Sequence, residues 1–172
     1  MNIILETERL ILRNPTVDDY QAMFKWCGDP EVNEFMYYTL YNNAEECIDY
    51  IKSLNPDNPD NCDLLFTLKE TGEVIGMGGL NYHPEKEAWE VGYNVRRDMW
   101  GNGYAPEALK AIVEHVKATG RLRCMYGTFA KANPKSGRVM EKLGMTYSED
   151  TTYTKMDGSK TFDAIIYRKQ FD

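Results

Sequence analysis

The sequence predicts an α/β (mixed α+β) fold with a central, mostly antiparallel mixed sheet flanked by helices. Three observations lead to this prediction: a cleanly alternating strand over 88–95, a long amphipathic helix over 104–119, and hairpin signals on both sides of them. The expected order is one strand, two helices, three strands, a helix, a strand, a helix and two strands, which suits a mixed sheet. A length of 172 residues fits a single domain over 1–172.

The N-terminal region supplies the first predicted strand, over 9–13, and two helices. Thr16 and Asp19 have the spacing of a capping box, so a helix is expected to start there and to end at Gly28. A second helix is predicted over 44–54 because its apolar residues recur at helical spacing.

The middle of the chain predicts a hairpin of strands over 64–68 and 74–80, turned near Gly72. Glycines in the second of these strands indicate a close backbone approach or a bulge. The strand over 88–95 follows, and alternation divides its side chains between two faces. One face carries Trp89, Val91, Tyr93 and Val95, and the other carries Ala88, Glu90, Gly92 and Asn94.

The C-terminal part begins with the helix over 104–119, whose start is set by Pro106 because proline fits the first helical turn. An Asp-Gly pair at 157–158 predicts the turn of a final hairpin. The remaining expected elements are a strand over 122–130, a helix over 135–143, and strands over about 146–154 and 161–169.

Charge and composition exclude several classes of function. The net charge of -7 repels phosphate backbones, so we expect no nucleic-acid partner, whereas a cationic amine is acceptable. The 4 cysteines form no Cys-x-x-Cys pair and the chain has 2 histidines, which argues against a metal site. No apolar run approaches the ~20 residues of a membrane span, and no secretion signal is visible. We therefore expect a cytoplasmic protein with no membrane partner.

The segment over 95–105 is the most informative part of the sequence. A strand ends, a loop with two glycines follows, and a helix begins, so unpaired backbone N–H groups and glycine flexibility together make an anion site. The absence of Gly-Lys-Ser/Thr excludes a P-loop, and the dinucleotide fingerprint is incomplete. A plain strand-to-helix turn is the alternative interpretation of the loop taken alone.

Several motifs in a fixed order resemble the GNAT acetyltransferase superfamily, and within it the RimJ/RimL-like branch. The resemblance spans nearly the whole chain and implies acetyl-CoA as cosubstrate, N-acetyl transfer, and a sheet splayed at the coenzyme A site. The motifs are Thr7-Glu8-Arg9-Leu10-Ile11-Leu12-Arg13, Glu90-Val91-Gly92-Tyr93, Trp100-Gly101-Asn102-Gly103-Tyr104-Ala105-Pro106-Glu107-Ala108, Asn133-Pro134-Lys135-Ser136 and Glu141-Lys142-Leu143-Gly144-Met145.

The resemblance also implies the cofactor-binding residues. Trp100 stands where the superfamily has Gln or Arg, a departure that is common in the RimJ/RimL-like branch. An exposed strand edge at Asn94 and Val95 is expected to bond the amides of the pantetheine arm. The backbone amides expected to hold the pyrophosphate are those of Gly101, Asn102, Gly103, Tyr104 and Ala105.

Two residues at the start of the helix over 135–143 are further candidates. Asn133 is expected to cap that helix and, by resemblance, to bond the pantetheine arm. Ser136 is either the donor that protonates the departing thiolate or an ordinary first-turn serine. Many superfamily members have a tyrosine acid near here, but this chain has Met140 at that place. Ser136 or a water must therefore supply the proton.

Glu90 is the preferred catalytic base, because an ammonium must lose a proton before it attacks a carbonyl. The alternative is a structural glutamate paired with a basic side chain. His83, beside Pro84, is expected to be a surface loop residue. Arg96 and Arg97 either touch phosphates or are solvated, with one at most facing the ligand. The tyrosines at 37, 38 and 41 either line an acceptor pocket or pack, with packing favoured for at least one.

The predicted function is direct acetyl transfer in a ternary complex, with a primary amine as acceptor, possibly a protein or peptide N-terminus. A small amine such as a polyamine, amino acid or aminoglycoside is the first alternative. A non-catalytic acyl-CoA-binding sensor is the second. The chain is expected to act as a monomer or a homodimer.

Overall fold

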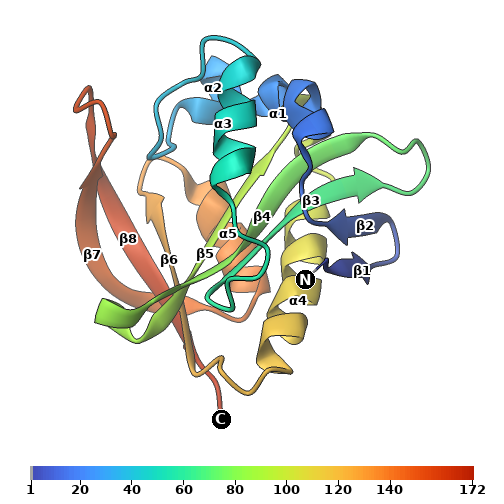
Figure 1. Cartoon of the computed structure of the whole chain (residues 1–172). Helices are drawn as coiled ribbons and strands as arrows, with labels where there is room; N and C mark the ends of the chain where they lie inside the picture. The colour runs from blue at the N-terminus through green and yellow to red at the C-terminus, as the bar shows by residue number, and fades with distance from the viewer. Residues whose placement is uncertain (1) are drawn as a thin grey trace.

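The computed structural model describes residues 2–172, which form an eight-stranded sheet with helices on both faces (Figure 1). The strand order is β1-β2-β3-β4-β5-β6-β8-β7. Strands β5 and β6 run parallel and the other neighbours run antiparallel, which confirms the predicted mixed sheet. The strands are β1 Ile4–Glu6, β2 Leu10–Arg13, β3 Asn61–Leu68, β4 Val74–His83, β5 Ala88–Val95, β6 Cys124–Ala130, β7 Thr146–Thr154 and β8 Thr161–Gln170.

Helices cover the two faces of the sheet in different numbers. Helices α4 and α5 lie over one face, and α1, α2 and α3 lie at the other (Figure 1). No helix within residues 2–172 is long and apolar enough to cross a lipid bilayer. The helices are α1 Tyr20–Cys27, α2 Pro30–Asn33, α3 Glu45–Ser53, α4 Tyr104–Lys117 and α5 Pro134–Lys142, with 3₁₀ turns η1 Val17–Asp19, η2 Pro84–Lys86 and η3 Arg97–Met99.

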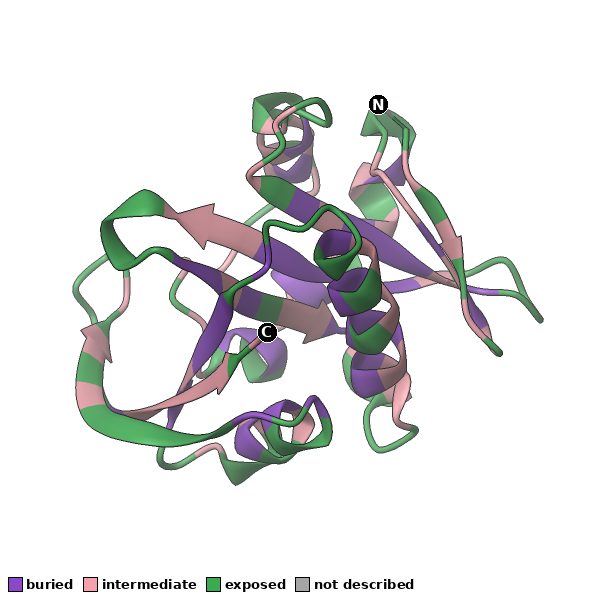
Figure 2. Ribbon diagram, turned by 90° about the horizontal axis from the view of Figure 1, so that it is seen from below, coloured by how far each residue is buried: buried purple, intermediate pink, exposed green. Residues whose placement is uncertain are grey.

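The two faces bury separate apolar cores. The α4 side is the larger, and the inner stripe of α4, including Leu109 and Ile112, packs on Leu64 and Phe66 of β3. The opposite core joins α1 and α3 to the sheet through residues such as Trp26. Figure 2 shows buried residues concentrated in the central strands and on the inner side of α4. Each fully buried Leu, Ile or Phe contributes about 1.5–3 kcal/mol, so these cores fix the strands that carry the site.

Several predicted boundaries need correction. Strand β1 and helix α2 were not expected, because elements of three and four residues are too short to show a period. Strand β6 begins at Cys124 rather than at 122. Strand β4 extends to His83, so the expectation that His83 lies in a loop is wrong. The Pro84 that suggested a loop starts the short turn η2 immediately after the strand.

The glycines of β4 permit the close approach that the sequence indicated. A Cβ atom at Gly79 would lie 1.9 Å from the backbone oxygen of Cys62, which leaves no room for a side chain. The register of β3 and β4 also shifts between Phe66 and Thr67, as in a bulge.

Strands β5 and β6 separate soon after they meet. Their pairing joins Trp89 to Met125 and Glu90 to Tyr126. Beyond these pairs β6 continues alongside β8, while β5 stays with β4 as far as Val95. The sheet is therefore splayed after Glu90, as expected, and the 91–95 edge of β5 is left open toward β6.

Candidate active site

A cleft of about 960 Å³ opens where β5 and β6 separate. Its walls come from β5, the loop before α4, the start of α5, β7 and the segment over 31–37. Nearly every predicted site residue lines this cleft, although the residues are spread over 47 positions of the sequence from 90 to 136. They are Glu90, Asn94, Val95, Trp100, Gly101, Gly103, Tyr104, Ala105, Asn133 and Ser136.

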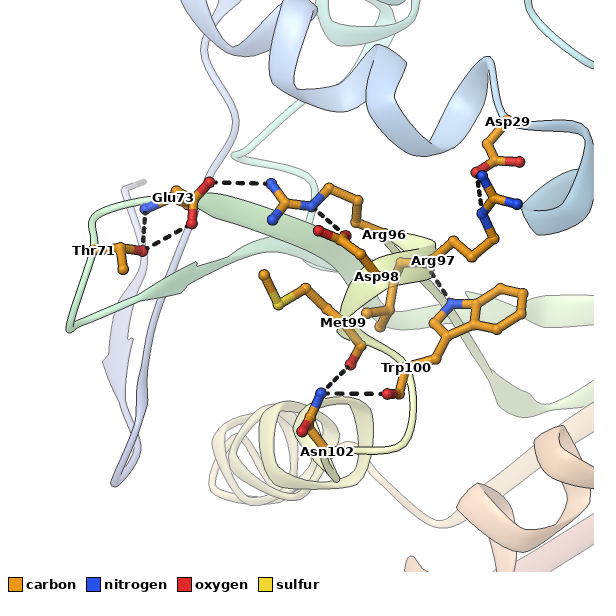
Figure 3. Close-up of polar contacts among 10 residues, drawn as sticks. Asp29, Thr71, Glu73, Arg96, Arg97, Asp98, Met99, Trp100 and Asn102 are labelled. Carbon is orange, nitrogen blue, oxygen red and sulfur yellow. Dashed lines mark hydrogen bonds and ion pairs between the residues drawn. The ribbon is translucent and has the colours of Figure 1, made fainter.

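Asn102 is the predicted site residue whose side chain the structure places elsewhere. Its Nδ2 donates to the backbone oxygens of Met99 and Trp100, at 3.1 and 3.3 Å (Figure 3). The side chain therefore stabilises the loop. Its backbone amide still belongs to the row of amides described next.

The loop before α4 has the form of an anion cradle. Gly101 and Gly103 both have a φ of 78°, a left-handed conformation that glycine adopts without a steric penalty. The first backbone bond of the helix runs from Glu107 N to Gly103 O. Between Trp100 and Glu107, the amides of residues 101–105 donate to no group in residues 2–172. Five consecutive donors at the positive end of a 14-residue helix favour a bound phosphate.

Trp100 holds this loop against the end of β5. Its indole Nε1 donates to the backbone oxygen of Val95 at 2.8 Å (Figure 3). The ring itself stays 41% exposed, with the Lys135 ammonium 5.6 Å from its centroid. Trp100 therefore closes the loop by an internal hydrogen bond and offers its flat surface to the cleft.

The start of α4 is also anchored from the N-terminal hairpin. Glu107 accepts hydrogen bonds from Thr7 Oγ1 at 2.7 Å and from Arg9 Nε at 2.8 Å. Burial opposes ionisation of Glu107, but the hydrogen bonds from Thr7 and Arg9 outweigh it and lower its pKa. The Arg9 guanidinium lies 4.3 Å from the ring centroid of Tyr104. This clamp fixes the helix end that carries the amides.

Neither Arg96 nor Arg97 lines the cleft, contrary to the possibility that one of them contacts a ligand phosphate. Arg96 pairs with Asp98 at 2.6 Å and with Glu73 at 3.4 Å, and Arg97 pairs with Asp29 at 3.1 Å (Figure 3). Their charges are thus used to fix the loop. The cations that do line the cleft were not expected: they are Lys86, Lys135, Arg138 and Lys142.

Asn133 and Ser136 lie together at the start of α5. Asn133 occupies the N-cap position, but its side chain makes no capping hydrogen bond within residues 2–172, so the predicted side-chain cap is wrong. Ser136 lies near the phenol of Tyr93 and opposes the effect of burial on the pKa of that phenol. Burial raises the pKa of Tyr93, so this phenol stays protonated. Met140, at the place of the missing tyrosine, is buried.

Glu90 lies at the last pair of β5 and β6, where the splay begins. Its Oε2 is 2.9 Å from His83 Nε2, and its carboxylate also hydrogen-bonds the phenol of Tyr126. Burial, followed by the charge of Glu90, raises the pKa of Tyr126, so the phenol is the donor. Lys86 Nζ in turn donates to Tyr126 Oη at 3.1 Å. The sequence predicted none of these contacts of His83, Tyr126 and Lys86.

A second set of contacts closes the far wall of the cleft. Lys155, just after β7, donates from Nζ to Asn33 O, Asn33 Oδ1 and Met36 O at 2.7, 3.0 and 2.9 Å. Tyr153 Oη donates to Phe35 O at 2.6 Å, and Met156 N donates to Tyr37 O at 2.9 Å. We call the paired segments 33–37 and 153–156 the acceptor wall. Figure 1 shows the β7–β8 hairpin rising beside the α2 end of the molecule.

The tyrosines at 37, 38 and 41 have different positions. Tyr37 lines the cleft and is 61% exposed. Tyr38 donates from Oη to Asn94 Oδ1 at 3.0 Å, and Tyr41 packs with the α1–α3 core. Packing for at least one of them is confirmed. Within residues 2–172, no cluster of three or more His, Cys, Asp or Glu side chains is placed to hold a metal ion.

Comparison with known proteins identifies the same family along most of the chain. The sequence pattern of the acetyltransferase (GNAT) domain matches residues 9–146. The uncharacterised N-acetyltransferase p20 of Bacillus licheniformis is 33% identical over 142 residues, which cover 81% of this chain and 80% of p20.

Two solved structures show the same fold. RimL, a ribosomal L7/L12 alpha-N-protein acetyltransferase in complex with coenzyme A, has a TM-score of 0.82 at 17% identity and covers 99% of both chains. MccE, a microcin C7 self-immunity acetyltransferase in complex with acetyl-CoA and AMP, has a TM-score of 0.81 at 15% identity. The alignment with MccE covers 95% of this chain and 93% of the MccE chain. At these identities the two structures establish the fold alone.

Proposed function

Because the chain belongs to the GNAT family and is an acetyl-CoA-dependent acetyltransferase, we propose that it acetylates a primary amine, such as a protein or peptide N-terminus. The observation that carries the proposal is the placement of one carboxylate, Glu90, at the head of a splay that leads to the row of amides at 101–105. The activating residue Glu90 and the anion cradle at 101–105 thus line one and the same cleft.

The residues present fit coenzyme A. The amides of 101–105 suit a diphosphate, and glycine at 101 and 103 leaves no side chain between these amides and a ligand. The edge of β5 beyond Glu90, where the predicted Asn94 and Val95 lie, suits the amides of a pantetheine arm, apart from the Val95 oxygen that accepts from Trp100. The side chain of Asn133, which makes no capping hydrogen bond, also suits these amides. When bound, acetyl-CoA supplies an acetyl group as a reactive thioester.

The chain's own residues then account for the proton transfers. Glu90 takes a proton from the ammonium, so that the amine nitrogen can form a C–N bond as the C–S bond breaks. A backbone N–H of the unpaired β5 edge stabilises the oxygen that becomes negative. Ser136, which lines the cleft at the start of α5, donates to the departing thiolate. No covalent acetyl-enzyme is needed, because amine and thioester meet directly in the cleft.

The acceptor is proposed by likeness and by the rim of the cleft. RimL acts on a protein N-terminus, and the exposed side chains of Tyr37 and Met156 beside the acceptor wall suit a peptide more than a small polar molecule. A small amine is the second candidate, because MccE is a self-immunity enzyme bound to AMP. The RimJ/RimL-like assignment, the single domain over 1–172, the monomer or homodimer and the cytoplasmic location stay predictions.

A thiol-release assay with acetyl-CoA tests the proposal over a panel of peptides, polyamines, amino acids and aminoglycosides. We expect turnover with at least one class, and Glu90→Gln to reduce it about 100-fold or more while coenzyme A affinity stays unchanged. Glu87→Gln, at an exposed position of the same hairpin, serves as the control for charge. Binding of acetyl-CoA without thiol release on any amine would show instead an acyl-CoA-binding sensor.

A further inference from the structure

His83 lies beside Glu90 and is not among the residues that line the cleft. Its Nε2 is 2.9 Å from Glu90 Oε2, and its Nδ1 is 3.3 Å from Glu85 Oε1. The exposed fractions of the side chains are 35% for His83, 40% for Glu90 and 65% for Glu85. The three groups therefore form a line from the cleft to solvent, with the imidazole in the middle.

The position of His83 follows from sheet register. Antiparallel pairing places His83 opposite Ala88 and Asn81 opposite Glu90, so alternate residues of β4 and β5 share a face. This face is the one that carries Glu90. The turn η2 then folds Glu85 back beside the same ring. Two neighbouring strands and a tight turn hold the line together.

We infer, on the basis of the proposed acetyl transfer, that His83 takes up the proton that Glu90 removes from the acceptor amine. Once Glu90 holds the proton taken from the amine, a neutral imidazole that donates Nδ1–H to Glu85 can accept that proton at Nε2. The ammonium N–H bond breaks and the proton binds a Glu90 oxygen. It then passes to Nε2, and the imidazolium releases its Nδ1 proton to Glu85 or water. His83 acts through Glu90 and is a relay residue.

The charges around the ring are consistent with this route. Glu85 and Lys86 belong to η2, Glu90 to β5 and Tyr126 to β6, with the Tyr126 ring centroid 6.1 Å from that of His83. On the far side, Arg168 of β8 lies 5.4 Å from the Tyr126 centroid. Lys86 donates to Tyr126 Oη. The cations Lys86 and Arg168 therefore lie beside Tyr126, whereas each imidazole nitrogen of His83 lies beside a carboxylate.

The test compares His83→Gln with His115→Gln, since the chain has 2 histidines and His115 lies on α4, outside the cleft lining. Glutamine can still donate to Glu90 but cannot take up a proton, so it separates the relay from simple orientation. In His83→Gln we expect kcat/KM to fall roughly 10-fold on its plateau and the acidic limb of its pH profile to differ from the native one, because the proton acceptor beside Glu90 is gone. His115→Gln is expected to keep the native plateau and limb. A His83→Gln enzyme with the native plateau and limb would overturn the inference.

A measurement without substrate separates this inference from the proposed function. Nitrogen-15 spectra of the two imidazoles are recorded against pH in the native protein and in Glu90→Gln. The nitrogen-15 signals of the His83 ring are expected to differ in the variant, because a neutral amide replaces the carboxylate 2.9 Å from Nε2, whereas those of His115 do not change. Unchanged His83 spectra would refute the coupling even in an active enzyme. Shifted spectra would support the pair even if no acceptor were found.

Discussion

The cofactor loop over 95–105 and the acceptor wall are built in opposite ways. The hydrogen bonds within the loop join residues two to five positions apart, such as Trp100 to Val95 and Asn102 to Met99. The side-chain bonds of the acceptor wall join residues 118 to 122 positions apart, such as Lys155 to Asn33. The loop that forms the anion cradle is therefore encoded locally, and the acceptor wall is encoded by the tertiary structure.

This difference accounts for what sequence comparison can transfer. A local loop can be kept or lost as one short motif. The acceptor wall depends on pairs of distant residues that can change independently, so two proteins can share the loop and differ at the wall. Family membership consequently identifies the acetyl donor and leaves the acceptor to be found by experiment. Each region should respond to its own substitutions and leave the other intact.

Gly103→Val is expected to have the largest effect that is confined to one of the two regions. A β-branched residue does not adopt a φ of 78° without strain, so the loop must turn its amides away from the ligand. Loss of one hydrogen bond to a charged group costs about 1.5–3 kcal/mol, so coenzyme A affinity should fall roughly 10- to 100-fold by calorimetry.

The matched control for that variant is Gly72→Val in the β3–β4 turn. Gly72 has a φ of 75°, and a Cβ atom there would meet nothing within 4 Å. Both variants should lose about 1–3 kcal/mol of unfolding free energy to strain. Equal affinities of the two variants for coenzyme A would show that the amides of the loop do not hold the ligand.

A smaller effect, at the other region, is expected from Lys155→Met. The variant removes a half-buried ammonium that donates to Asn33 and Met36, so the two halves of the acceptor wall can separate. Acceptor KM should rise roughly 10-fold, because a loss of about 1.4 kcal/mol of acceptor binding free energy corresponds to a factor of ten. Coenzyme A affinity should be unchanged. Lys160→Met, in the same hairpin, is the control. A parallel loss of coenzyme A affinity would mean that the regions are coupled.

The smallest effect on either ligand is expected from Asp63→Asn, on β3. Burial raises the pKa of Asp63 to about 6 from an ordinary 3.8, and the hydrogen bond from Asn81 opposes the rise. The native state therefore binds the proton more tightly than the unfolded chain, and stability falls as pH rises from about 4 to 6. The asparagine variant should lack this fall of roughly 2–3 kcal/mol in unfolding free energy. Changes in coenzyme A affinity or acceptor KM would contradict the independence of the two regions.

Sequence patterns predicted the helices and strands whose apolar residues recur at a clear period. They also predicted where the residues on those elements lie. Alternation in 88–95 placed Glu90 and Asn94 on one face, and the glycines with Pro106 fixed the start of α4. His83 was misplaced because the following proline indicates a loop, although the strand continues to His83 itself. The partners of Lys155 left no signal, because a lysine that meets carbonyl oxygens 119 and 122 residues away follows no local pattern.

The order of the strands determines when β8 can join the sheet during synthesis. Strand β8 lies between β6 and β7, and β7 pairs with β8 over its length. As the ribosome extends the chain, β1 to β5 and α4 can associate before β8, the strand that pairs with both β6 and β7, has been synthesised. Residues 161–170 must leave the exit tunnel before that strand can pair. Nascent protein halted before this point would present strand edges to chaperones, and release of the C-terminal segment would complete the acceptor side in one late step.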